Sequence, residues 1–246
     1  ELAERLPFVL DAIYAAYAEG WSDAAGTDAS AREMAGEAIW LGRLAAMLLP
    51  DQAEALGLLA LMLHSQARRA ARRDTLGEFV PLSEQDTGLW DGAMMTEAEQ
   101  LLRRAAAMND IGRFQLEAAV QSAHAVRCLK GAADWTAIVT LYDALWDMTA
   151  SPVIAINRAI AIAETRGPQQ GLAALDAIDA GPLSNTSPIG RPGRIFWPRP
   201  APMMRRAMPM TAPSALRSTP PSAASCRRAN RPWPRTDRSA RVARRE

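Results

Sequence analysis

The sequence predicts an all-α protein, with antiparallel helix hairpins in a tetratricopeptide-like solenoid, followed by a disordered tail rich in Arg and Pro. Three observations point to this fold class. Residues 1–185 are rich in Ala and Leu and poor in β-branched and aromatic residues, which favours helix over strand. Their apolar residues recur at the spacing of one helix face. The last three predicted helices are short and joined by tight turns, as in helix-hairpin solenoids, although no strict repeat is visible.

The first three predicted helices are bounded by capping and breaking residues. The first spans residues 5–19, the second runs from Asp28 or Ser30 to about residue 49, and the third spans residues 51–73. Gly20 ends the first helix, and Pro50 separates the second from the third. The residues expected to face inward are Val9, Ile13 and Ala16 on the first helix, Ile39, Leu44, Met47 and Leu48 on the second, and Leu56, Leu59, Leu63 and Ala67 on the third.

A loop over residues 77–87 separates these helices from five more. Phe79, Val80 and Leu82 are expected to pin the loop to the helices. Asp134 caps the third of the later helices, Ser151 and Pro152 begin the fourth, and a turn at residues 167–168 precedes the last. The first two of the later helices are predicted over residues 94–108 and 114–129. The other three are predicted from the residues expected to face inward, which are Ile138, Leu141, Tyr142 and Leu145 on the third, Val153, Ile156, Ile160 and Ala163 on the fourth, and Leu172, Leu175 and Ile178 on the fifth.

The chain divides into a helical domain, residues 1–183, and a tail, residues 184–246. Residues 1–185 carry 14 basic and 25 acidic residues, whereas residues 186–246 carry 14 Arg against Asp237 and Glu246. The tail also holds 11 of the 17 prolines and few aliphatic residues, so it cannot bury enough apolar surface to order itself. The last helix should therefore expose the apolar face formed by Leu172, Leu175 and Ile178.

Two interpretations of the tail are open. The favoured one is a shifted reading frame near Asn185, because the helical pattern ends where the tail begins. Residues that the restored frame would force, such as Asp from Met203–Met204 and Ala from Trp197–Pro198, agree with a helix pair that closes the solenoid. The alternative is a genuine basic arm, in which Arg residues and Trp197 and Trp233 bind nucleic acid through phosphates and base stacking.

Seven residues are candidates for contacts with a partner. Arg68, Arg69, Arg72 and Arg73 form two i,i+4 pairs at the predicted end of a helix. They can contact phosphate or an acidic partner, but a solvated last turn that complements the helix dipole is favoured. Around a loop–helix junction lie Asp86, Trp90 and Asp91. These three can form an interaction patch, although Trp90 can equally cover the edge of the core.

Three further polar residues are expected to have structural roles. His124 lies in mid-helix, on roughly the same side as Glu117 and Gln121, and is interpreted as a hydrogen-bonded packing residue rather than a general base. Asn157 and Arg158 fall inside an apolar helix, where the Asn amide can hold helix register by hydrogen bonding. The sequence contains no nucleophile elbow, phosphate-binding loop, dinucleotide fingerprint or zinc-protease motif, so an enzyme is not expected, nor a cofactor or a metal.

Several strings occur together and in a fixed order: RLPFVLDAIYAAYAEGW, EAIWLGRLAAMLLP, EALGLLALMLHSQARRAAR, LSEQDTGLWD, FQLEAAVQSAHA, DWTAIVTLYDAL and SPVIAINRAIAIAETRGPQQGLAALDAI. Residues 1–185 thereby resemble the tetratricopeptide-like C-terminal extension of extracytoplasmic-function (ECF) sigma factors of the sigma-24 type. Ala18, Trp21 and Gly88 depart mildly from the family pattern.

The resemblance implies a regulatory or interaction domain of a factor that directs RNA polymerase to promoters. The expected partners are RNA polymerase and the sigma core regions, in the cytoplasm, with no membrane contact and no small-molecule substrate. Sigma regions 2 and 4, which read promoter DNA, would precede residue 1, so the resemblance assigns no promoter contact to this chain. The alternative is a stand-alone helical-repeat adaptor that binds a protein partner, with a basic tail that binds nucleic acid.

Overall fold

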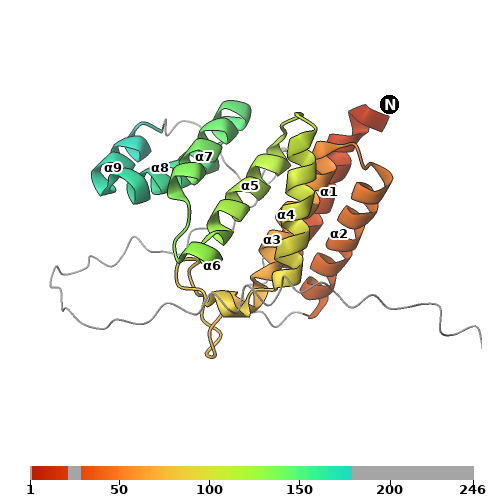
Figure 1. The fold of residues 1–246 in the computed structure, drawn as a ribbon, viewed down its shortest axis with the longest axis horizontal. Coiled ribbons are helices and arrows are strands. Elements are labelled where there is room, and N and C mark those ends of the chain that lie inside the picture. Colours follow the sequence, from red (N-terminus) through yellow and green to blue (C-terminus); the bar gives the residue numbers. More distant parts are fainter. Residues whose placement is uncertain (1, 22–28, 179–246) are drawn as a thin grey trace, which may run out of the picture.

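The computed structural model describes residues 2–21 and 29–178, and within these ranges it contains helices and no strand. The predicted all-α fold is therefore confirmed. The helices pack as neighbouring pairs, in a row that runs from α2 at one end to α9 at the other (Figure 1). In chain order they are α1 (Leu2–Trp21), α2 (Ala29–Leu48), α3 (Ala53–Ala67), the 3₁₀ helices η1 (Arg69–Arg72) and η2 (Thr87–Leu89), α4 (Gly92–Ala107), α5 (Arg113–Ala125), α6 (Arg127–Lys130), α7 (Trp135–Thr149), α8 (Pro152–Arg166) and α9 (Pro168–Asp176).

Two hydrophobic clusters hold this row together. The first joins α1, α2, α3 and α4 to the start of α5, and the second joins the rest of α5 to α7 and α8. Because α5 contributes Phe114 to the first cluster and Val120 to the second, it links the two halves of the described fold.

α3 is the centre of the first cluster. The predicted inward residues Leu56, Leu59, Leu63 and Ala67 are all buried, as is nearly every other residue of the helix. A helix that is apolar on all sides needs neighbours on all sides, and α3 has α2, α4 and α5 as its main partners. Each fully buried Leu contributes about 1.5–3 kcal/mol to stability.

On three other helices the buried face differs from the prediction. Val9 is exposed on α1, where Leu10 and Tyr17 are buried beside the expected Ile13. On α2, Met47 and Leu48 are exposed, and on α8 Val153 and Ile160 point outward. The predictions of inward Val9, Met47, Leu48, Val153 and Ile160 were wrong because these helices carry apolar residues on more than one side. On α9, Leu172 is exposed as expected, whereas Leu175, and Ile178 just after the helix, are half-buried.

Two helices end earlier than predicted. α3 ends at Ala67, where Arg68 leaves the helical hydrogen-bond pattern, and the chain continues as the tighter turn η1 rather than as helix to Arg73. The helix predicted over 114–129 is broken at Val126 into α5 and α6.

Helix starts agree better with the sequence. Asp134 accepts a hydrogen bond from the backbone N–H of Ala137 and caps α7 as predicted. Pro152 is the first residue of α8, although the Ser151 side chain makes no capping hydrogen bond. The proposed Asp28 cap, residues 179–183 of the predicted domain, and the whole of the predicted tail at 184–246 lie outside the described residues.

Candidate functional site

Three of the four arginines in the segment after α3 make partly buried contacts with distant parts of the fold. Arg68 donates from Nη2 to Gln121 Oε1 of α5 over 2.5 Å and from Nε to the His64 carbonyl over 3.2 Å. Burial lowers its pKa to about 10. Contacts of this kind fix the guanidinium inside the fold, so Arg68 is not part of a solvated last turn.

The next two arginines hold the end of α1. Arg69 donates to the Gly20 carbonyl over 3.4 Å, and Arg72 donates to the Trp21 carbonyl over 2.9 Å. Arg73 bonds locally, to the Gly77 carbonyl at 2.5 Å. Arginine at a helix C-terminus satisfies carbonyls that have no partner within the helix. Arg68, Arg69 and Arg72 thus bond to carbonyl or amide oxygens of the protein, which differs from the solvated last turn that the sequence favoured.

Asp86, Trp90 and Asp91 belong to the path of the loop rather than to an open patch. Asp86 caps η2 by accepting from the Gly88 N–H, and Asp91 caps α4 by accepting from the N–H groups of Ala93 and Met94. The Trp90 side chain is buried. Its ring lies 5.6 Å from the guanidinium carbon of Arg127, which also donates to the carbonyls of Leu82 and Gln85.

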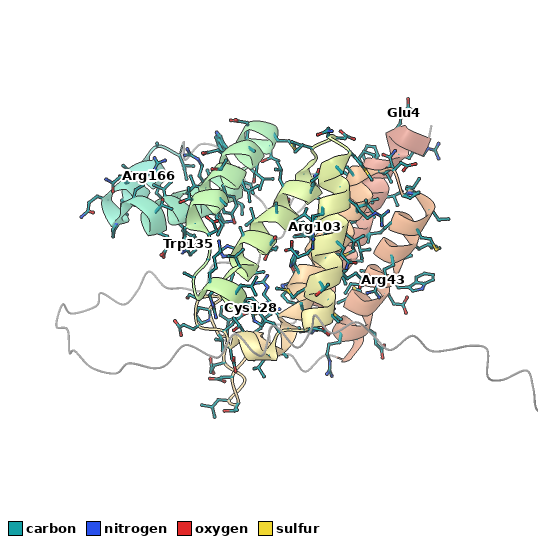
Figure 2. The ribbon with its side chains drawn as sticks, in the orientation of Figure 1. Glu4, Arg43, Arg103, Cys128, Trp135 and Arg166 are labelled. Carbon is teal, nitrogen blue, oxygen red and sulfur yellow. The ribbon has the colours of Figure 1, made fainter. Side chains whose placement is uncertain are left out.

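His124 is a packing residue with a neutral ring. It contacts the Trp135 ring of α7 edge-on, with the centroids 5.2 Å apart; Trp135 is labelled in Figure 2. Burial, together with the positive charges of Arg68 and Arg127, lowers its pKa to about 4. A ring that stays neutral through the physiological range packs well but is a poor general base.

Asn157 and Arg158 lie on α8, beside α7. Arg158 forms an ion pair with Asp143 across the two helices. The Nδ2 group of Asn157 is buried without a hydrogen-bond partner, so the expected register-holding bond from this group is not formed. Arg158, rather than Asn157, is the residue that bridges the helices by a polar contact.

The structure also shows a buried carboxyl group that was not predicted as a site. Glu117 of α5 is 2% exposed, and neither of its carboxyl oxygens has a hydrogen-bond partner. Arg113 Nε is 3.6 Å from Oε1. Burial raises the pKa of Glu117 to about 7, and its charge helps to raise the pKa of Tyr14 and Tyr142. The spacing of Glu117, Gln121 and His124 on one side of α5 was the signal in the sequence.

A second polar group lies between α3, α4 and α5. His64 is 1% exposed, and its Nε2 faces Glu99 Oε1 at 3.4 Å. Ser122 donates to the same carboxylate oxygen over 2.5 Å. In a serine hydrolase the imidazole stands between the hydroxyl and the acid, whereas here the carboxylate stands between the imidazole and the hydroxyl. This order holds helices together but does not activate Ser122 as a nucleophile.

A hollow of about 400 Å³ lies beside the turn between α6 and α7. Lys130, Asp134 and Trp135 line it from that turn, and Glu164 and Thr165 line it from α8.

The described ranges contain no group of three or more His, Cys, Asp or Glu side chains that could hold a metal ion. Within the same ranges, none of the helices combines the length and apolar character needed to span a bilayer.

Comparison with known proteins adds a family match and one relative. The model of a family of unknown function (DUF6596) matches residues 5–106, which correspond to α1 through α4. The chain is 37% identical over 176 residues to Uncharacterized protein R00370 of Rhizobium meliloti (strain 1021). That alignment covers 72% of this chain but 42% of the relative, so the chain spans less than half the length of the curated relative that it matches. No solved structure matches.

Proposed function

We propose that this chain is the regulatory, protein-binding domain of an ECF-type sigma factor and acts without catalysis. One observation carries the proposal. Apart from Asn157, the polar residues that the sequence singled out are engaged in hydrogen bonds, capping, packing or ion pairs, whereas large apolar side chains are exposed on the outer helices. Exposed apolar surface of this kind marks a place where another protein binds.

The sigma-factor part of the proposal rests on the order of the sequence strings. Seven segments that resemble the family extension occur in order over residues 5–178. The longer relative is consistent with a domain of a larger protein. In such a protein the domain would bind the sigma core or RNA polymerase in the cytoplasm, while the other regions read the promoter.

In vitro transcription tests this proposal. The complete reading frame at the locus, including any in-frame sequence upstream of codon 1, would be expressed and added to core RNA polymerase. We expect promoter-directed transcripts from the complete protein and a loss of activity when residues 2–178 are deleted. If the complete protein neither binds core polymerase nor supports initiation, the sigma-factor assignment is wrong and a stand-alone adaptor is the better interpretation.

A further inference from the structure

α2 presents small residues to the protein and large ones to the outside. Its inner face consists of Ala35, Ala38, Ile39, Gly42 and Ala46, all buried. A Cβ atom added at Gly42 would lie 2.5 Å from Met62 Cε of α3, so the glycine leaves room for the end of that side chain. The buried face of α2 is made mostly of small residues, and the large apolar residues of α2 other than Ile39 lie largely outside it.

The large residues form two rows on the opposite side. Met34, Leu41 and Leu48 recur every seven residues in one row, and Trp40 and Met47 form the other. Trp40 is 58% exposed, Met47 68% and Leu48 66%. A helix that is apolar on two opposite sides normally lies between two partners. α1 and α3 occupy the inner side, and α2 lies at the edge of the row of helices (Figure 1).

The spacing and the charges indicate what kind of partner fits this face. Rows of residues seven apart stay in line along a second helix, as in a coiled coil. Toward the N-terminal end, the exposed Glu33 lies seven residues before Trp40 and continues its row, and the exposed Glu37 lies one turn after Glu33 on the same side of the helix. Arg43, which is labelled in Figure 2, lies at the edge of the face and is paired with Glu97 of α4 over 2.7 Å. The face therefore carries Trp40, Leu41, Met47 and Leu48 in its C-terminal half, and two acids beside Met34 in its N-terminal half.

We propose that the outer face of α2 binds an amphipathic helix of the sigma core. This helix would place apolar side chains against Trp40, Met47 and Leu48, and Lys or Arg side chains beside Glu33 and Glu37. The proposal rests on the function proposed above and adds to it the surface and the chemistry of the partner. Trp40 is expected to be its main anchor, because exposed Trp residues dominate the binding energy of many interfaces.

A binding experiment with two kinds of variant tests the face. The bait is the full 246-residue chain, and the probe is the polypeptide encoded in frame upstream of codon 1, expressed separately. We expect Trp40→Ser/Met47→Ser to raise the Kd by about 30-fold or more, the effect of losing a hot spot. The matched control, Leu76→Ser/Leu129→Ser, removes exposed apolar residues elsewhere and should bind like the wild type. Circular dichroism confirms that each variant is folded.

The charge argument has its own variants. Glu33→Lys/Glu37→Lys should weaken binding, and increasing salt should weaken the wild type more than this variant, because the variant has lost the attraction that salt screens. The control, Glu84→Lys/Asp147→Lys, makes the same charge change at exposed positions away from α2. Equal binding by both charge variants would contradict a basic partner helix.

The outcomes separate the face from the function. If the wild type binds the probe and Trp40→Ser/Met47→Ser binds equally well, the assignment of α2 is wrong while the proposed function stands. If the wild type does not bind the probe, or no such reading frame exists, the assignment of α2 and the proposed function are both wrong. If the wild type is a dimer by sedimentation and Trp40→Ser/Met47→Ser is a monomer, the face joins two copies of this chain and the proposed partner is wrong.

Discussion

The guanidinium carbon of Arg72 lies 4.0 Å from the centre of the Trp21 indole ring, and Nη1 of the same residue donates to the Trp21 carbonyl over 2.9 Å. One side chain thus combines a cation–π contact with a cap on the last turn of α1. The two residues are 51 positions apart, so the contact ties the start of the described chain to the turn that follows α3.

Replacing Arg72 should therefore loosen the end of α1. We expect Arg72→Ala to lower the free energy of unfolding by about 1–3 kcal/mol, from the lost hydrogen bond and the lost ring contact. Urea denaturation measures the change. Arg104→Ala, at an exposed position on α4, is the control and should change stability little. Equal stability of the two variants would show that the Arg72 contact adds nothing.

Glu117 and His124 should give opposite pH dependences of stability. The folded state holds the pKa of Glu117 near 7 rather than 4.5, so the folded state favours the neutral carboxyl group. The free energy of unfolding therefore falls as the pH rises from 4.5 through 7. The folded state holds the pKa of His124 near 4 rather than 6.5, so stability from its neutral form is lost as the pH falls from 6.5 through 4. Each effect amounts to about 3 kcal/mol.

Single variants should separate these two slopes. In the wild type they oppose each other between pH 4.5 and 6.5. We expect His124→Gln to become less stable as the pH rises through this range and Glu117→Gln to become more stable. Denaturant unfolding across the range measures both slopes, and the double variant is the control that should lack both. Parallel profiles for the two single variants would contradict the assignment.

Two glycine substitutions should have effects of opposite sign. A Cβ atom at Gly57 of α3 would lie 2.6 Å from the backbone nitrogen of Gln115, so the start of α5 would have to move. We expect Gly57→Ala to destabilise the fold by about 3 kcal/mol. Gly36→Ala is the matched control, because a Cβ there meets nothing within 4 Å; it should stabilise α2 by about 0.5–1 kcal/mol. Thermal melts compare the two, and a stable Gly57→Ala protein would contradict the close approach of α3 and α5.

Arg127 should control the mobility of the loop before α4. Its guanidinium donates to the Leu82 and Gln85 carbonyls and faces the Trp90 ring. We expect Arg127→Ala to cost about 1.5–3 kcal/mol and to speed proteolytic cleavage within residues 77–91. Arg103→Ala, which removes a hydrogen bond within α4 alone, serves as the control. Equal cleavage rates for the two variants would show that Arg127 does not hold the loop.

The candidate site was less predictable than the fold. Arg68, Arg69 and Arg72 were candidates from the sequence, but the direction in which their side chains point was not predictable. That direction depends on the turn after Ala67 and on the carbonyls of Gly20 and Trp21. Glu117 was visible only as one of three polar residues on the same side of α5. Its burial became evident when α1, α3 and α7 were in place around it.

The sequence by itself determined that the described chain is helical and where most helices begin, because a cap such as Asp134, or Pro152 at the first turn of α8, acts within a few residues of itself. Only the tertiary structure decided which side of α2 faces inward. That helix is apolar on two sides, so periodicity could not choose between them. The packing of α1 and α3 against the face with the small residues made the choice, since Ala35 and Ala46 lie inside and Trp40 and Met47 remain outside.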